Sequence, residues 1–280
     1  MKVGLVLEGG AMRGLYTAGV LDVFLDNNIE FDGIIGVSAG VLFGVNYLSK
    51  QKGRVLRYNK KFLNDKRYMG LWSLLTTGNI INKEFSFYEV PQKLDIFDNE
   101  EYKKSKTSFY ATVTNMKTGK PEYIKLTDVF EQMELLRATS AMPYVSKIVE
   151  LENGKYLDGG LSDSIPVEKC KELGFEKIVV ILTRPIEYRK KKPKEILAKV
   201  AYRKYPNFAK TLNNRYKMYN ETVEKIIDME NKKEIFVIRP SKLVKVKRIE
   251  KNPEKLQEIY DLGIEDAKSK IEELKKFINN

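Results

Sequence analysis

The segment Gly36–Gly40, with the sequence GVSAG, matches the G-x-S-x-G pattern that presents a nucleophilic serine. In this pattern a sharp turn from a strand into a helix exposes the serine oxygen, and Gly36 and Gly40 leave room where the two elements crowd together. Apolar residues on both sides predict the required strand and helix, so Ser38 is our candidate nucleophile. A tight turn in which the serine only caps a helix is the structural alternative.

The composition restricts the base that could activate Ser38. The 280 residues include no histidine and one cysteine, Cys170. This excludes Ser-His-Asp triads, Cys-His dyads and metal sites built on histidine or several thiolates. A serine hydroxyl is a weak nucleophile that needs a base within hydrogen-bonding distance. Asp158, followed by Gly159 and Gly160 at the end of a predicted short strand, is the best candidate, because the glycines leave space for an ester.

A loop of small residues, Gly9–Gly14 with the sequence GGAMRG, follows the first predicted strand. Free backbone N–H groups and a helix N-terminus in such a loop stabilise a developing negative charge. We expect the N–H groups of Gly10 and Ala11 to bind an oxyanion, with Gly9 and Arg13 shaping the loop. A phosphate-binding loop needs the same features, although Ala11 replaces the third glycine of a dinucleotide site and no Walker lysine follows. Close packing of helix and strand without a ligand is the structural alternative.

Together these segments resemble the patatin-like phospholipases. Members of that family combine a glycine-rich oxyanion loop followed by Arg-Gly, a G-x-S-x-G serine, and an Asp-Gly-Gly or Asp-Gly-Ala aspartate, which form a Ser–Asp dyad. The resemblance covers residues 1–185 in the right order and spacing. The matching segments are Glu8–Gly14, Gly19–Leu21, Gly36–Gly40, Ala138–Pro143, and Asp158–Gly160 with Pro166 downstream.

The resemblance implies a fold, a reaction and a set of roles. The fold is α/β, a three-layer α/β/α sandwich with a mostly parallel central sheet. Asp158 takes the proton of Ser38, the serine attacks an ester carbonyl, and water activated by Asp158 hydrolyses the acyl-enzyme. The implied enzyme is a serine carboxylic-ester hydrolase for lipids, a phospholipase A, lysophospholipase or carboxylesterase without metal or organic cofactor. Ala11 and Ser164 depart from the family pattern, which has glycine and often asparagine there.

The elements around these motifs predict the same class of fold. Strands over residues 3–7 and 31–37 and helices over residues 13–25 and 39–48 form two strand–turn–helix units, which favours a parallel, helix-covered sheet. Residues 70–82 look irregular. The remaining predictions are a helix over 53–63, a hairpin of 109–114 and 122–126, a helix over 128–139, short strands over 148–151 and 155–157, a helix over 166–173 and a strand over 177–183.

Residues 186–280 differ in composition and form a predicted basic, mostly helical extension packed on the catalytic domain, residues 1–185. They contain 25 basic and 15 acidic side chains, against 25 and 23 before them. Helices are predicted over 194–230, with a break at Pro206, and over 253–278, with a strand over 234–238 between them. Lysines and tyrosines interleaved in Ile186–Lys217 suit an anionic membrane surface rather than nucleic acid. Because the lone cysteine fits a reducing compartment, we expect a cytoplasmic protein that contacts the membrane periphery. The alternative is a catalytically silent protein that binds a membrane surface, or a phosphate or nucleotide through the Gly9–Gly14 loop.

Overall fold

The computed structural model describes residues 1–279, and within them eight strands form one sheet. Its parallel part consists, in spatial order, of β3 (Ser108–Asn115), β2 (Gly33–Val37), β1 (Val3–Leu7), β7 (Lys177–Ile181) and β8 (Ile235–Ile238). The strands β1, β2, β7 and β8 are almost wholly buried and consist mainly of Val, Ile, Leu and Gly. Such continuous apolar runs are typical of a parallel sheet that is covered on both faces.

An antiparallel group of strands extends the sheet beyond β3. It contains β4 (Pro121–Leu126) and β6 (Gly154–Asp158), which both pair with β3, and β5 (Val149–Leu151), which pairs with β6. The register places Thr112 of β3 opposite Val37 at the end of β2, and Val113 opposite Asp158 at the end of β6. The ends of β2 and β6 therefore meet at one edge of the sheet.

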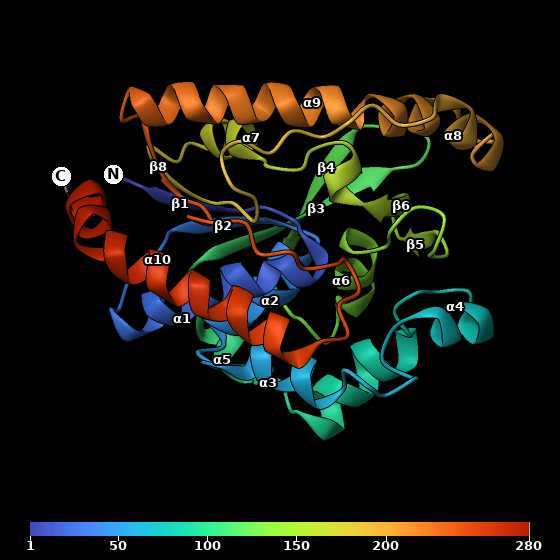
Figure 1. Ribbon diagram of the computed structural model, residues 1–280, viewed down its shortest axis with the longest axis horizontal. Helices are drawn as coiled ribbons and strands as arrows, with labels where there is room; N and C mark the ends of the chain where they lie inside the picture. The colour runs from blue at the N-terminus through green and yellow to red at the C-terminus, as the bar shows by residue number, and fades with distance from the viewer. Residues whose placement is uncertain (280) are drawn as a thin grey trace.

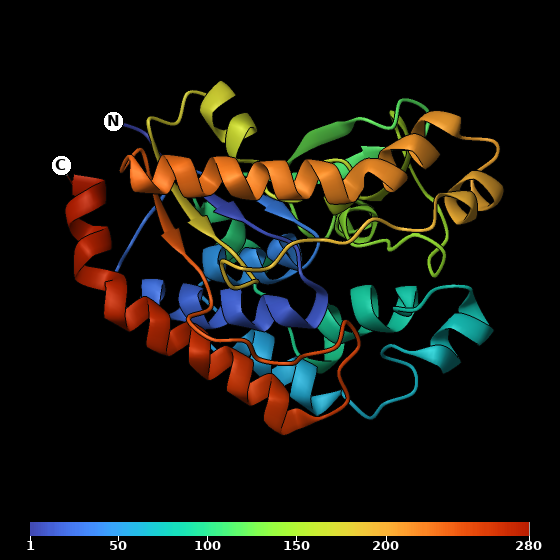
Figure 2. The same cartoon turned by 45° about the horizontal axis from the view of Figure 1, so that its top comes forward.

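Helices cover both faces of the sheet, as Figures 1 and 2 show. The helices α7 (Val167–Glu172) and α9 (Pro206–Asn231) cover one face, where Tyr219, Val223 and Ile226 of α9 pack against Val6 and Ile35. The other face carries α1 (Leu15–Asp26), α2 (Ala39–Leu48) and α10 (Pro253–Asn279). These layers confirm the three-layer α/β/α fold with a mostly parallel sheet.

The peripheral elements lie mostly on the side of α1 and α2. They are α3 (Arg54–Lys61), α4 (Leu71–Thr77), a π-helical segment at Lys83–Leu94, α5 (Asn99–Lys104), α6 (Met133–Thr139) and α8 (Glu195–Ala201). The C-terminal helix α10 crosses α1 so closely that a Cβ at Gly19 would overlap the carbonyl oxygen of Tyr260. This close approach explains why glycine is needed at position 19, within a segment that the sequence pattern had singled out.

Two predictions about the elements were wrong or incomplete. Residues 70–82 contain α4 between Gly70 and Gly78, and the π-helical segment after it was not predicted. The helix predicted from residue 128 begins at Met133, because Asp128 Oδ1 accepts hydrogen bonds from the N–H groups of Phe130 and Glu131 in a preceding turn. The division at residue 185 stays a prediction, although β8 joins the sheet and α10 packs on α1.

Candidate active site

Ser38 lies in a strained turn between β2 and α2. Its backbone has φ 55° and ψ −121°, a conformation that is unfavourable for a residue with a side chain by about 1–3 kcal/mol. Hydrogen bonds hold the turn. The N–H of Ser38 donates to Thr139 Oγ1 at 3.0 Å, and this hydroxyl donates to the carbonyl oxygen of Thr112 at 2.6 Å. The strand–turn–helix geometry that the GVSAG pattern predicts is therefore present.

The side chains of Ser38 and Asp158 form a direct hydrogen bond. Ser38 Oγ donates to Asp158 Oδ2 at 2.7 Å, and both residues are buried, with exposed fractions of 9% and 7%. The other carboxylate oxygen accepts from the N–H of Gly160 at 2.8 Å. Thr114 Oγ1 donates to the Asp158 carbonyl at 2.8 Å, and the Asp158 N–H donates to the carbonyl of Ala141 at 2.9 Å. These contacts orient one oxygen of the carboxylate toward the serine.

Burial determines the proton affinity of the Asp158 carboxyl. Desolvation raises its pKa above the ordinary aspartate value, and the nearby positive charge of Arg215 and the hydrogen bonds from Ser38 and Gly160 lower it by less. A carboxylate with a raised pKa accepts a proton more readily than a solvated one. The site thus contains a base that is stronger than an ordinary aspartate, in contact with the hydroxyl that it would activate.

The two glycines after Asp158 have different functions in the loop. A Cβ at Gly159 would overlap the carbonyl oxygen of Thr112, so a side chain there would displace the loop from β3. Gly160 presents its N–H to Asp158, while its carbonyl accepts from Ser164 Oγ at 2.7 Å and from Arg215 Nε at 2.5 Å. Ser164 therefore supports the aspartate loop directly, from a position at which the family pattern often has asparagine.

The small-residue loop lies against the turn that carries Ser38. Gly9 packs against Val37 and Ser38, and Ala11 lies beside Ser38 with φ 50°. Within residues 1–279 the N–H groups of Gly10 and Ala11 donate no hydrogen bond, and Ala11 begins a short 3₁₀ helix that ends at Gly14. Such free donors beside a nucleophile can stabilise an oxyanion.

Glu8 precedes this loop, and Arg13 lies within it. Glu8 is buried, and its carboxylate accepts from the N–H and the hydroxyl of Thr183, at 2.6 and 3.1 Å, and from Tyr219 OH at 2.9 Å. The N–H of Arg13 donates to the Gly10 carbonyl at 3.2 Å, which closes the turn. Both residues thus fix the backbone from which the free donors project.

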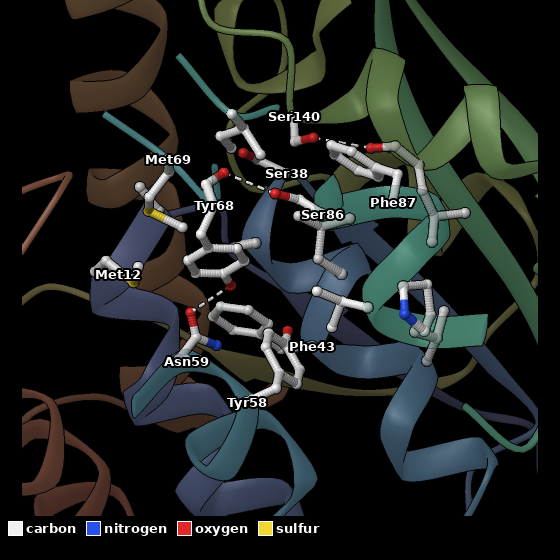
Figure 3. Close-up of a pocket in the computed structure, with 18 of the residues that line it drawn as sticks. Met12, Ser38, Phe43, Tyr58, Asn59, Tyr68, Met69, Ser86, Phe87 and Ser140 are labelled. Carbon is white, nitrogen blue, oxygen red and sulfur yellow. Dashed lines mark hydrogen bonds between the residues drawn. The ribbon is translucent and has the colours of Figure 1, made fainter. Parts of the chain in front are cut away.

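Two pockets meet at Ser38. The first contains about 960 Å³ of space free of protein atoms and is lined mainly by apolar side chains, among them Met12, Leu42, Phe43, Tyr58, Met69 and Phe87. Figure 3 shows Ser38 near one end of this pocket and Tyr58 and Asn59 near the other. The second contains about 670 Å³ and is polar, and Asp158, Gly10 and several basic residues line it. An ester at Ser38 would have apolar surroundings on one side and charged surroundings on the other.

Comparison with known proteins places this chain in a family. The sequence model of the patatin-like phospholipase family matches residues 5–170, and a second model, a domain of unknown function (DUF6363), matches residues 205–279. The chain belongs to the patatin-like phospholipase family.

Its relatives include proteins with and without a known activity. The uncharacterised protein YjjU of Escherichia coli is 30% identical over 194 residues, which cover 66% of this chain and 52% of YjjU. Lysophospholipase nte1 of Aspergillus fumigatus is 28% identical over 189 residues, 64% of this chain and 12% of that protein. Among solved structures, VipD from Legionella pneumophila has a TM-score of 0.43 at 11% identity, covering 96% of this chain and 66% of VipD. The chain therefore spans about half or less of these two sequence relatives.

Sequence reasoning missed several residues of this patatin-like site. Thr139 was noted only as part of Ala138–Pro143, and Thr114 was not noted. Arg215 was assigned to a membrane-facing segment, as was Lys190, yet both side chains line the polar pocket. No spacing rule links these residues to Ser38, because the contacts depend on how distant elements pack. The only sequence signal for the two basic residues was the alternation of basic and aromatic side chains in Ile186–Lys217. That alternation predicts a membrane-binding surface.

Other residues have structural explanations. Cys170 is buried in the layer beneath α9, where desolvation raises the pKa of its thiol to about 12. Across residues 1–279 no cluster of three or more His, Cys, Asp or Glu side chains is arranged to hold a metal ion. Over the same residues, every helix is too short or too polar to traverse a bilayer. The cytoplasmic location stays a prediction.

Proposed function

We propose that this patatin-like chain hydrolyses lipid esters with Ser38 as nucleophile and Asp158 as general base. The decisive observation is the 2.7 Å hydrogen bond from Ser38 Oγ to Asp158 Oδ2 in a chain without histidine. The raised pKa of Asp158 and the free N–H groups of Gly10 and Ala11 support the same assignment.

The reaction proceeds in two steps. In the first, Asp158 takes the proton of Ser38, the serine oxygen attacks the ester carbonyl, and the N–H groups of Gly10 and Ala11 stabilise the oxyanion. Asp158 then gives its proton to the alkoxide that leaves. In the second step, Asp158 takes a proton from water, the resulting hydroxide attacks the acyl-enzyme, and the proton returns to Ser38 as the fatty acid departs.

The apolar pocket supports a lipid acyl chain as the group that is transferred to Ser38. Mainly apolar side chains line this pocket, so its walls suit a hydrocarbon chain. The description of nte1 as a lysophospholipase is consistent with such a substrate. Phospholipase A, lysophospholipase and broader carboxylesterase activities all fit this proposal.

A membrane surface is the proposed source of this substrate. Helix α4 exposes Leu71, Trp72 and Leu75, and α8 exposes Ile196, Leu197 and Val200, each more than half accessible. Figures 1 and 2 show both helices at the same end of the molecule. Exposed apolar residues next to lysines are typical of interfacial binding.

A loop over residues 142–147, which borders the site, forms hydrogen bonds to the segments that follow α4 and α8. The N–H of Lys147 donates to Asn79 Oδ1 just after α4, at 2.9 Å, and the N–H of Tyr144 donates to Tyr202 OH just after α8, at 2.7 Å. Met142, at the start of this loop, lines both pockets. A membrane that contacted α4 and α8 would therefore lie close to the entrance of the site.

Labelling with a fluorophosphonate tests the catalytic assignment. We expect covalent modification of Ser38 in the native chain, no modification of Ser38→Ala, and normal modification of Ser241→Ala, a control at an exposed surface serine. A native chain that is folded but neither labelled nor active on any ester would contradict the proposal. A silent membrane- or phosphate-binding protein would then be the better interpretation.

A further inference from the structure

Basic side chains surround the polar pocket beside the dyad. Of the described residues that line it, the basic ones are Arg13, Arg184, Lys190, Arg215 and Arg248, and the acidic ones are Glu8 and Asp158. The basic residues come from the glycine loop, from the segment after β7, from α9 and from the segment before α10. Four separate parts of the chain therefore converge on one positively charged space.

These basic side chains form no close ion pair in the described part of the chain, whereas their neighbours outside the pocket do. Arg189 pairs with Glu224 at 2.6 Å, and Lys192 pairs with Glu195 at 2.9 Å. In addition, Arg13 Nε is buried and lacks a hydrogen-bond partner. Five basic side chains share this pocket with only two carboxylates, and an excess of partly buried positive charge is unfavourable, so this arrangement favours an anionic ligand.

The two carboxylates of the pocket are already engaged. Glu8 accepts hydrogen bonds from Thr183 and Tyr219, and Asp158 accepts from Ser38 and Gly160. An ammonium group in this pocket would find no free carboxylate among the described residues and would lie among positive charges. The pocket therefore disfavours choline or ethanolamine headgroups and favours a phosphate without a cationic substituent.

Lys190 is held in the pocket by its backbone. Its N–H donates to Asn220 Oδ1 at 2.8 Å, its carbonyl accepts from Asn220 Nδ2 at 3.1 Å, and its Nζ lies 2.9 Å from the centroid of the Tyr219 ring. This clamp directs the side chain toward the site and away from the molecular surface. Lys190 therefore lines the pocket, and membrane contact by the segment that contains it stays a prediction.

The surroundings of Lys190 weaken its positive charge until an anion binds. Burial lowers its pKa to about 6, and the positive charges of Arg215, Arg13 and Arg184 act in the same direction. Glu8 acts in the opposite direction. A bound phosphate would favour the protonated amine, so binding of the anion and protonation of Lys190 support each other.

We propose that this pocket binds the phosphate of an anionic lipid headgroup without an ammonium, as in phosphatidate and lysophosphatidate. Ala11, Ser38, Met142 and Arg248 line both pockets, so one substrate can place its acyl chain in the apolar pocket, its ester at Ser38 and its phosphate among the basic residues. This inference rests on the ester hydrolysis proposed above and adds the class of headgroup.

The proposal gives a function to the C-terminal part of the chain. Apart from Arg13, the basic residues of the pocket lie beyond residue 170, where the match to the patatin-like family ends. Arg215 and Arg248 lie within residues 205–279, which match a domain of unknown function. In this view, the patatin-like part supplies the dyad, and the C-terminal part supplies the recognition of the headgroup.

Binding of soluble headgroups to the Ser38→Ala chain tests the subsite without catalysis. We expect glycerol 3-phosphate to bind, in calorimetry, at least about ten-fold more tightly than glycerophosphocholine, because charged hydrogen bonds form without ammonium repulsion. Adding Lys190→Gln or Arg248→Gln should weaken glycerol 3-phosphate binding about ten-fold. The exposed neighbours Lys191→Gln and Lys247→Gln serve as matched controls and should leave it unchanged. Arg248 is itself exposed, so its variant keeps the test valid if the variant at Lys190 fails to fold.

Hydrolysis of matched lipids separates this inference from the proposed function. Lysophosphatidate, lysophosphatidylcholine and monoacylglycerol with the same acyl chain are compared as dispersed monomers. We expect the native ratio of kcat/KM for lysophosphatidate over monoacylglycerol to fall about ten-fold in Lys190→Gln and in Arg248→Gln. Ester hydrolysis with equal rates for all three lipids, or equal binding of both soluble headgroups, would overturn the inference and leave the dyad intact. No hydrolysis of any ester, together with headgroup binding that follows the expected order, would overturn the proposed function alone.

Discussion

The two parts of this chain contribute to the site in different ways. Residues 1–185 hold the dyad and the glycine loop in short motifs, whose residues are fixed by tight turns at the ends of β1, β2 and β6. Residues 186–280 contribute single side chains, such as Lys190, Arg215 and Arg248, from unrelated elements. Backbone strain and close approach restrict the sequence locally, whereas a charged pocket needs only side chains that converge in space. The first kind of site can be recognised from sequence patterns, and the second needs the folded structure.

The largest effect should come from the dyad. Ser38→Ala should lower kcat/KM on a short-chain ester by about 10⁴-fold or more, because it removes the proposed nucleophile. Asp158→Asn should lower it nearly as far, since the amide retains the shape of the carboxylate but cannot take the proton. The double variant should be little worse than either single variant, because the two residues act as a unit. Additive losses would indicate a different base, with a lysine as the first suspect.

Asp158→Asn should also increase stability, which distinguishes loss of the base from unfolding. The folded-state pKa of Asp158 is raised, so above the ordinary aspartate pKa its ionised form disfavours folding. The amide removes this penalty, and its melting temperature at neutral pH should exceed that of the native chain. The difference should shrink as the pH falls below the folded-state pKa of Asp158. A lower melting temperature at neutral pH would mean that the carboxylate stabilises the fold.

The next largest effect concerns binding to a membrane. Reversal of Lys191, Lys192 and Lys194 to glutamate should weaken binding to anionic vesicles by up to about 100-fold at low salt, since each well-placed lysine contributes about 1 kcal/mol. The salt dependence of binding should fall as well. A matched variant changes three other exposed lysines to glutamate, namely Lys233 just after α9 and Lys268 and Lys276 on α10. This variant should bind vesicles normally. If both variants bound vesicles equally well in co-sedimentation, the surface that carries Lys191, Lys192 and Lys194 would not be the membrane-binding surface.

A smaller effect should show that the C-terminal part also influences catalysis. Arg215 donates to the carbonyl of Gly160 and lowers the pKa of Asp158 through its charge. Arg215→Gln should lower kcat/KM about ten-fold on esters without phosphate, because the aspartate loop loses a support. The acid limb of the pH profile should move to higher pH, because removal of the positive charge raises the pKa of Asp158. Lys217→Gln on the same helix is the control, and an unchanged acid limb in Arg215→Gln would refute this electrostatic link.

Much of the fold follows from local patterns in the sequence. The helix predicted at Ala39–Leu48 has those bounds in the structure, and the strands around the site lie within a few residues of their predicted positions. The π-helical segment at Lys83–Leu94, which lines the apolar pocket, could not be predicted, because Pro91 and its mixed polarity give no helical period. The place of Lys190 in the polar pocket could not be predicted for a similar reason. A lysine next to Lys191 and Lys192 looks exposed, and only the clamp by Asn220 turns it inward.

The smallest effect concerns Ala11, which stands where the family pattern has glycine. Its φ of 50° is unfavourable for a residue with a Cβ by about 1–2 kcal/mol, but glycine gains up to about 1 kcal/mol of freedom in the unfolded chain. Ala11→Gly should therefore change the free energy of unfolding by less than about 1 kcal/mol and leave kcat/KM within about two-fold. Ala11→Val should lose most activity, because a β-branched residue disfavours positive φ and would move the N–H groups of Gly10 and residue 11. Urea unfolding and a short-chain ester assay measure both variants. Full activity in Ala11→Val would mean that these N–H groups are not the oxyanion donors, because their geometry could not survive that change.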